Sequence, residues 1–257
     1  MIVAGIDVGS ITAEAVILKD GDILASVIMP TGASSKVAAD RVLDEALHKV
    51  GLSSQDLKYI VATGYGRISA SPAHKRVTEI TCHGRGAYFL FPSARTVIDI
   101  GGQDSKVIRL GPEGQVIDFA MNEKCAAGTG RFLEVMARAL EVELEDLAVL
   151  SRKASRSVPI SSICTVFAES EVVSLIATGQ PRENIIRGIH DSIAERTAGL
   201  LNRVGIEEDV IMTGGVANNS GVVTAIEEKI GIRLNIPERP DIIGALGAAL
   251  IAADHAK

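Results

Sequence analysis

The chain repeats one order of elements, and this repeat limits the folds that it can adopt. Residues 2–8, 12–18 and 23–29 are apolar runs joined by glycine-containing turns, which is the pattern of a β-meander. From Thr96 the order begins again, with runs at residues 96–100, 106–110 and 115–119. Residue identity between the halves is low, yet three strands with a glycine turn between the first two predict two related lobes. Pro92-Ser93 is the expected boundary, which divides the chain into residues 1–93 and 94–257.

Between and after these strands, apolar residues recur at the three- and four-residue spacing of helices. The expected helices span residues 35–50, 78–90, 130–140, 144–153, 168–177, 181–204 and about 241–253, and short strands are expected at 58–63 and 209–213. Asp241 follows Pro240 and is expected to be the N-cap of the last helix. This alternation predicts an α/β fold of two lobes, in which the last helix is able to pack back on the first lobe.

Composition excludes several classes of function. The 257 residues are 47% hydrophobic and 23% charged, so the chain can bury a core as one large domain or two small ones. A net charge of −6, 3% aromatic residues and no Trp argue against a nucleic-acid partner. The start of the chain lacks the pattern of a signal peptide, and no apolar run reaches the length of a membrane span. The sequence therefore predicts a cytoplasmic protein without a membrane partner.

Two of the turns suit phosphate. In Ile6-Asp7-Val8-Gly9-Ser10 and in Ile98-Asp99-Ile100-Gly101-Gly102-Gln103-Asp104, a strand carries Asp near its end and turns through Gly, which leaves backbone N–H groups unshielded beside a carboxylate. One Asp-x-Gly turn is ordinary turn chemistry. The same turn in both halves of a repeat favours a nucleotide held between the lobes, with Asp7 and Asp99 on a hydrated Mg²⁺ at its β- and γ-phosphates.

A third glycine turn follows the strand expected at residues 209–213. In Thr213-Gly214-Gly215-Val216-Ala217, the backbone at the two glycines can approach a flat ring, which suits the adenosine end of a nucleotide. Together, and in this order, the three turns resemble those of actin, sugar kinases and the seventy-kilodalton heat-shock chaperones. The resemblance implies two ribonuclease-H-like lobes with ATP in the cleft between them.

The resemblance also implies roles for individual residues. It implies that Asp7 and Asp99 serve Mg²⁺ or its water. The residues that it implies for the phosphates are Gly9, Ser10, Ile11, Thr12, Ala13, Gly101, Gly102, Gln103 and Asp104. Those expected at the nucleoside are Gly214, Gly215, Asn218 and Asp241.

Two of the three cysteines stand just before expected helices. Cys125 precedes the helix at residues 130–140 and Cys164 the helix at 168–177, and a helix start is an electropositive setting that favours thiolate. Burial as ordinary apolar cysteines is the alternative. Two thiolates do not complete the four-ligand shell of an iron-sulfur cluster, but a twofold dimer would supply two more. Cys82 matches no ligand motif and is expected to be a packed thiol.

A closer resemblance rests on four segments, at residues 5–10, 99–106, 124–130 and 213–217. They resemble the activator component of 2-hydroxyacyl-CoA dehydratases, which is related to the ATP-binding subunits of benzoyl-CoA reductase. The resemblance implies a homodimer that holds one 4Fe-4S cluster through Cys125 and Cys164 of each subunit. It implies that hydrolysis of ATP to ADP drives transfer of one low-potential electron to the dehydratase, with ferredoxin or flavodoxin as donor.

Within the activator resemblance, Asp7, Asp99, Gln103 and Asp104 are the catalytic candidates, and Gln103 is expected to couple phosphate to electron transfer. The runner-up is a small-molecule kinase, such as an amino-sugar kinase, in which Asp99 acts on a substrate hydroxyl and the cysteines are structural. A third alternative is a nucleotide-dependent partner-binding module without catalysis. No sugar-recognition insertion is evident, and the cysteines favour the activator. The dispersed histidines, which include His83, are expected at the surface or in packing.

Overall fold

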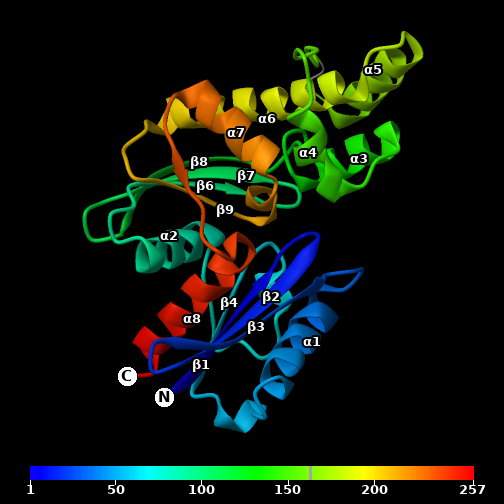
Figure 1. Ribbon diagram of the computed structural model, residues 1–257. Coiled ribbons are helices and arrows are strands. Elements are labelled where there is room, and N and C mark those ends of the chain that lie inside the picture. The colour runs from blue at the N-terminus through cyan, green and yellow to red at the C-terminus, as the bar shows by residue number, and fades with distance from the viewer. Residues whose placement is uncertain (162–163) are drawn as a thin grey trace.

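The computed structural model describes residues 1–161 and 164–257 and consists of two lobes, each built on a five-stranded sheet (Figure 1). The first sheet has the order β3-β2-β1-β4-β5 and the second β10-β9-β6-β7-β8. The strands of the first sheet are β1 (Ile2–Val8), β2 (Thr12–Lys19), β3 (Asp22–Pro30), β4 (Tyr59–Thr63) and β5 (Lys75–Arg76). Those of the second are β6 (Thr96–Ile100), β7 (Ser105–Leu110), β8 (Val116–Asn122), β9 (Val210–Thr213) and β10 (Leu234–Asn235).

The two sheets have the same topology. In the first, β1 is antiparallel to β2 and parallel to β4, and in the second, β6 is antiparallel to β7 and parallel to β9. The meanders predicted from the repeat are therefore confirmed. The short edge strands β5 and β10 were not predicted, because two-residue pairings leave almost no pattern in the sequence.

Eight helices are found in the described part of the chain. They are α1 (Ser35–His48), α2 (Glu79–Leu90), α3 (Gly130–Leu140), α4 (Leu147–Ser151), α5 (Thr165–Ala177), α6 (Arg182–Val204), α7 (Ser220–Ile230) and α8 (Ile243–His255). The helix predicted at residues 144–153 is a 3₁₀ turn followed by the short α4. The helix α7 is not among the helices expected from the sequence. No helix in residues 1–161 or 164–257 combines the length and apolar character needed to cross a membrane.

The prediction that Asp241 caps the last helix is wrong. Residues 240–242 form a 3₁₀ turn, and α8 begins only at Ile243 with Ile242 at its N-cap. Because the 3₁₀ turn runs directly into α8, the carboxylate has no open helix end to cap. It instead accepts a hydrogen bond from Arg239 Nε at 3.2 Å.

The elements stack in layers, with α2 and α8 between the two sheets (Figure 1). The helix α1 covers the outer face of the first sheet, and α6 and α7 cover the outer face of the second. The helix α3 lies beyond the end of the second sheet and shares its core. The middle layer forms one apolar core with residues of both sheets, among them Val3 and Val61 of the first and Val97 and Ile211 of the second. The last helix therefore packs on β1, β2 and β4 of the first lobe although it follows the second.

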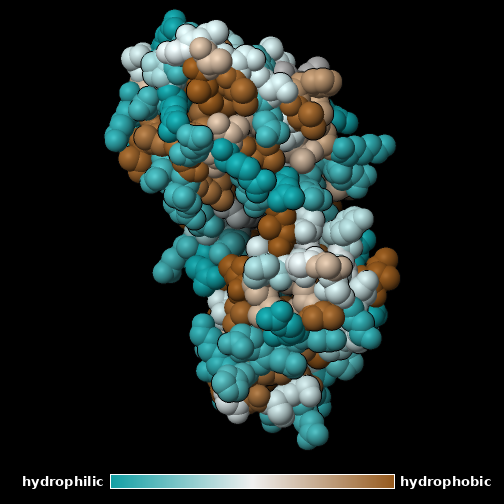
Figure 2. All heavy atoms as spheres, turned by 90° about the vertical axis from the view of Figure 1, so that its right-hand side faces the viewer, coloured by the Kyte–Doolittle hydropathy of each residue, from teal (hydrophilic) through white to brown (hydrophobic). Residues whose placement is uncertain are grey.

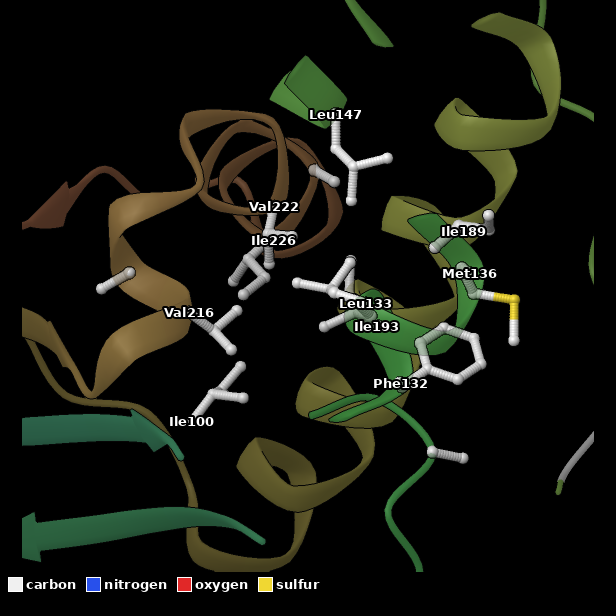
Figure 3. Packing of buried hydrophobic residues seen from close by; sticks show 14 of the residues in the cluster. Ile100, Phe132, Leu133, Met136, Leu147, Ile189, Ile193, Val216, Val222 and Ile226 are labelled. Atoms are coloured by element: carbon white, nitrogen blue, oxygen red, sulfur yellow. The ribbon is translucent and has the colours of Figure 1, made fainter. Parts of the chain in front are cut away.

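The core of the second lobe brings together side chains of β6, α3, α6, α7 and the turn after β9. Figure 3 shows side chains of α3, α6 and α7 converging, with Leu133 beside Ile193 and with Val216 close to Ile100 at the end of β6. Phe132 is also fully buried in this cluster. Because α3 and the turn after β9 share one core with the end of β6, movement of one of them strains the packing of the others.

His190 of α6 is buried in this lobe, and neither of its ring nitrogens has a hydrogen-bond partner among the described residues. Burial disfavours the charged imidazolium and lowers the pKa of His190 from 6.5 to about 4. The folded pKa lies below the unfolded one, so the stability from this neutral imidazole is complete above pH 6.5. It is lost as the pH falls from 6.5 towards 4.

We expect this titration to remove about 3 kcal/mol of stability, at 1.36 kcal/mol per pKa unit. Urea unfolding at pH 7.5 and 4.5 measures the loss, and His190→Leu should diminish it. The same replacement at His48, on the exposed end of α1, is the control and should keep the wild-type pH dependence. Equal pH dependence in wild type and His190→Leu would contradict the prediction.

Candidate functional site

A cavity of about 750 Å³ lies between the lobes, where the glycine turns of both sheets meet. Figure 2 shows the two lobes as two bodies with an indentation between them. All but one of the candidate nucleotide residues line this cavity: Asp7, Gly9, Ser10, Ile11, Thr12, Asp99, Gly101, Gly102, Gln103, Asp104, Gly214, Gly215, Asn218 and Asp241. The exception is Ala13, which pairs with Val8 in the β1–β2 ladder and buries its methyl group in the core.

The two Asp-containing turns are built alike and face each other. In the first, Gly9 N donates to Thr12 O at 2.9 Å, and in the second, Gly101 N donates to Asp104 O at 3.0 Å. A Cβ added to Gly102 would lie 2.7 Å from Ile11 Cγ1, which belongs to the opposite turn. The lobes thus bring two sets of turn backbone to one place, as a phosphate chain requires.

Asp7 and Asp99 occupy equivalent positions in the two sheets. Asp7 lies beside Thr63 of the parallel neighbour β4, and Asp99 beside Thr213 of β9. A glycine with φ of +84° follows each threonine, at positions 64 and 214. A Cβ on either glycine would lie within 3 Å of the adjacent carboxylate oxygen, so only glycine leaves room for these side chains.

The residues opposite the two aspartates break this symmetry. Glu14 of β2 is paired with Asp7 in the ladder, whereas Lys106 of β7 is paired with Asp99. Lys106 is buried, and its Nζ lies 3.1 Å from Asp99 Oδ2, 2.8 Å from Asp104 Oδ1 and 3.8 Å from a carboxylate oxygen of Glu79. The second lobe thus compensates its carboxylate with a fixed cation, and the first lobe adds another carboxylate.

The protonation of the two aspartates differs accordingly. Burial raises the pKa of Asp7 to about 7, and the charges of Glu79 and Asp99 add to this. Burial likewise raises the pKa of Glu14 well above its usual range. For Asp99, burial is outweighed by the charges of His83 and Lys106 and by hydrogen bonds from Lys106 and Thr213, which hold its pKa below the usual value. A divalent cation near Asp7 would supply the positive charge that the first lobe lacks.

These side chains do not enclose a metal by themselves. Within residues 1–161 and 164–257, no group of three or more His, Cys, Asp or Glu side chains is placed to hold a metal ion. A magnesium ion at Asp7 and Asp99 would therefore need phosphate oxygens and water for its remaining ligands, as Mg²⁺ commonly does in nucleotide sites.

His83 of α2 joins the two carboxylates, a role that the sequence analysis missed. Its Nδ1 lies 3.1 Å from Thr213 Oγ1 and 3.2 Å from Asp99 Oδ1, and its Nε2 lies 3.7 Å from Asp7 Oδ2. Burial lowers the pKa of His83. The sequence did offer one indication of this role. Glu79 lies one helical turn before His83 on the same face of α2, and both residues line the cavity.

Aliphatic side chains line the cavity near the Gly214-Gly215 turn, where the sequence predicts the nucleoside. The turn at Gly214-Gly215 leads into a 3₁₀ helix, Gly215–Asn218, whose Val216 lines the cavity. Leu133, Leu144 and Ala148, from α3 and the segment that contains α4, line the same cavity. A slot bounded by glycine backbone and aliphatic side chains suits a flat aromatic base. The glycines were recognisable from the sequence, whereas the aliphatic residues lie at ordinary core spacing in helices and were not predicted.

Cys125 and Cys164 differ from Cys82 in exposure. Cys125 is half-buried against the core of the second lobe, and Cys164 is exposed at the N-cap of α5. Residues 162 and 163, which precede it, lie outside the described part of the chain. Cys82 is fully buried, which raises the pKa of its thiol to about 12 and makes it unreactive.

The start of α3, which follows the loop of Cys125, is hydrogen-bonded to the glycine turn at residues 101–104 of the second lobe. Gly130 N donates to Gly101 O at 2.9 Å and Arg131 N to Gly102 O at 2.8 Å. These two amides belong to the first turn of α3. The helices that follow the two cysteines, α3 and α5, also pack on each other.

Comparison with known proteins agrees with this geometry. The pattern of the BadF/BadG/BcrA/BcrD ATPase family matches residues 4–252. The chain is 53% identical to the activator of lactoyl-CoA dehydratase from Anaerotignum propionicum, over 100% of this chain and 99% of the relative.

Two solved structures have the same fold over their whole length. One is component A of (R)-2-hydroxyglutaryl-CoA dehydratase from Acidaminococcus fermentans, with a TM-score of 0.95 and 48% identity, covering 100% of this chain and 99% of that one. The other is the activator of 2-hydroxyisocaproyl-CoA dehydratase from Clostridium difficile with bound ADPNP. Its TM-score is 0.94 and its identity 47%, and the match covers 100% of this chain and 96% of that one. This chain, with its two actin-like lobes, therefore belongs to the BadF/BadG/BcrA/BcrD ATPase family and is related to the activators of 2-hydroxyacyl-CoA dehydratases.

Proposed function

We propose that this protein binds MgATP between its lobes and uses ATP hydrolysis to deliver one low-potential electron to a 2-hydroxyacyl-CoA dehydratase. The observation that carries the proposal is the pair of hydrogen bonds from Gly130 and Arg131 to the phosphate turn at Gly101 and Gly102. Through them, the turn that we assign to phosphate is connected to the start of α3, which directly follows the loop of Cys125. A phosphate-dependent change in the turn then has a short path to a candidate redox ligand.

In this proposal the two lobes divide the work on the nucleotide. The turns at residues 9–12 and 101–104 bind the phosphates through backbone N–H groups, and Asp7 and Asp99 orient the water ligands of Mg²⁺. Lys106 and Thr213 hold Asp99 ionised and fixed in position. Gln103 is exposed into the cavity and is the residue we assign to sensing the terminal phosphate. The apolar slot near Val216 takes the adenine ring.

The chemistry of the cysteines fits an iron-sulfur cluster shared by two copies of the chain. Cys125 and Cys164 supply two thiol donors, and four are needed. Beyond Cys164, α5 presents Val166 and Val173 on one face with 65% and 53% of their surfaces exposed, and Phe167 is 69% exposed. Figure 2, which faces the side where α3 and α5 lie in Figure 1, shows apolar side chains gathered on the upper lobe.

A second copy of this chain would cover that apolar surface and add the two missing thiolates. A 4Fe-4S cluster held by Cys125 and Cys164 of both copies would supply the low-potential electron. The relatives are activators of dehydratases, so the electron acceptor in this proposal is a dehydratase component. We assign ferredoxin or flavodoxin as the donor class.

The kinase alternative is not supported by the site. Only 2% of Asp99 is exposed, and both of its oxygens already accept hydrogen bonds, from Lys106 and from Thr213. A catalytic base must accept the hydroxyl proton of its substrate, and the lowered pKa of Asp99 makes this carboxylate a weak base.

Anaerobic purification followed by measurement of iron, sulfide and subunit mass tests the proposed function. We expect about four irons per dimer, lost in Cys125→Ser and in Cys164→Ser, because each copy supplies two of four cluster ligands. Cys82→Ala is the matched control and should keep its iron, since this thiol is buried in the interlobe core. A colourless, iron-free protein that phosphorylates an amino sugar would refute the proposal.

Gln103→Ala is expected to retain the iron content of the wild type and to weaken ATP-stimulated electron transfer. The amide side chain is lost from the cavity while the backbone of the turn remains, so nucleotide still binds but its terminal phosphate is not sensed. Electron delivery to a dehydratase component, with and without ATP, measures the effect. Gln55→Ala, at an exposed position outside the cavity, is the control. Unchanged ATP stimulation in Gln103→Ala would contradict the assignment.

A further inference from the structure

Thr129 lies between Cys125 and α3, at the N-cap of that helix, and its side chain is fully buried. Its hydroxyl Oγ1 is 3.0 Å from the carbonyl oxygen of Gly102 and 2.6 Å from that of Ala126. Gly102 belongs to the phosphate turn, and Ala126 is the neighbour of Cys125. The side chain thus touches both of the segments that the proposed function needs to couple.

A threonine hydroxyl has only one proton to donate. Two carbonyl oxygens are within hydrogen-bond distance of Thr129 Oγ1, and neither can give a proton back. A full hydrogen bond to one of them therefore weakens the hydrogen bond to the other. The hydroxyl is thus one donor with two alternative acceptors, Gly102 O in the phosphate turn and Ala126 O in the Cys125 loop.

The fold does not depend on which acceptor is chosen. Gly102 O also accepts from Arg131 N at 2.8 Å, and Ala126 O also accepts from Thr129 N at 3.1 Å. Each carbonyl keeps a backbone partner when the hydroxyl turns away, so neither choice leaves a buried oxygen without a hydrogen bond. Neither arrangement therefore carries the cost of an unpaired buried carbonyl, so the hydroxyl is free to follow a change in the position of the turn.

We propose that Thr129 is a positioning residue that couples the phosphate turn to the Cys125 loop by donating its one hydroxyl hydrogen bond to either Gly102 O or Ala126 O. When phosphate draws the backbone of the turn towards itself, Gly102 O moves relative to the hydroxyl, and the hydroxyl donates its hydrogen bond to Ala126 O instead. The backbone of the loop then shifts at Ala126, the residue after Cys125. The carbonyl oxygen of Cys125 itself accepts a hydrogen bond from Asn122 Nδ2 at 3.1 Å. This inference rests on the proposed nucleotide and electron-transfer roles.

Hydrogen-deuterium exchange on the anaerobically purified protein tests this coupling. Exchange at the phosphate turn, residues 101–104, and at the Cys125 loop, residues 124–127, is compared with and without saturating Mg-ADPNP. In wild type and Thr129→Ser, which keeps the hydroxyl, both segments should respond. In Thr129→Val, the turn should still respond while the response of the loop falls about fivefold, as expected for loss of one hydrogen bond.

Thr129→Ala serves as a second variant without the hydroxyl, in case the valine disturbs packing. Thr224→Val is the matched control, because its hydroxyl donates only within α7, to Ser220 O, and the variant should respond as wild type does. Affinity for ADPNP should stay within about threefold in all four variants, since a loss of one such hydrogen bond away from the ligand is small.

A wild-type loop response in either folded hydroxyl-free variant would overturn the inference, as would a wild-type loop that does not respond. Hydrogen-deuterium exchange can be measured whether or not the protein contains iron or delivers electrons. A protein that lacks the cluster but shows the Thr129-dependent response would therefore refute the electron-transfer role and leave the coupling standing.

Discussion

Lys106→Met is expected to abolish ATP hydrolysis and to lower the free energy of unfolding by about 3–5 kcal/mol. Lys106 is buried and contacts Asp99 at 3.1 Å and Asp104 at 2.8 Å. Methionine replaces the length of the side chain but removes the only lysine or arginine among the described residues that forms an ion pair with Asp99. Three carboxylates, those of Glu79, Asp99 and Asp104, then remain in the site without their cation. Asp99 loses the charge that keeps it ionised and in place.

Phosphate release at saturating MgATP and urea unfolding measure these two effects. Lys229→Met is the matched control, because Lys229 forms a surface ion pair with Glu195. Exposed pairs contribute little, so we expect a change below about 1 kcal/mol and normal ATP hydrolysis. Near-normal hydrolysis in Lys106→Met would show that Asp99 needs no fixed cation.

Gly247→Ala is expected to destabilise the protein by about 3 kcal/mol or more. Gly247 lies on α8 where it crosses α2, and an added Cβ would lie 1.8 Å from the backbone oxygen of Cys82. A backbone atom cannot rotate away as a side chain can, so the two helices must separate. Because α2 carries His83 into the site, this separation also displaces the link between Asp7 and Asp99, and nucleotide affinity should fall with stability.

Thermal unfolding and titration with a nucleotide analogue measure both effects. Gly199→Ala is the same substitution in α6, at an exposed position where the added methyl meets nothing within 4 Å. There alanine only improves helix propensity, and we expect a gain of up to about 1 kcal/mol. Equal effects of the two substitutions would mean that the contact between α2 and α8 is not tight.

Much of the fold was predictable because it is encoded locally. The meanders of both lobes follow from apolar runs separated by glycine turns, and their bounds in the structure differ from the prediction by only a few residues. The helix expected at residues 144–153 is confirmed only in part, because its apolar spacing did not show that residues 144–146 would form a 3₁₀ turn before α4. Asp241 failed as a cap for a similar reason, since Pro-Asp fits both a helix start and a 3₁₀ turn.

In the candidate site too, some residues were predictable from local sequence and others were not. Asp7, Asp99 and their glycines were recognised from motifs of a few residues, because strand end, carboxylate and turn are neighbours in the chain. Glu14 and Lys106 each follow a recognised aspartate by seven residues, but their roles depend on ladder register. That register makes Asp7 and Asp99 electrostatically different, although their motifs look equivalent.

Short-range sequence was sufficient for the two sheets, the three glycine turns and the family to which the chain belongs. Only the tertiary structure brought His83 to Thr213, 130 residues away. It also placed Thr129 between the phosphate turn and Cys125. The reason is physical: turns and strands depend on the backbone preferences of adjacent residues, whereas these contacts depend on how layers close over a shared core. Many residue patterns satisfy that closure equally well, so it leaves no distinctive pattern in the sequence.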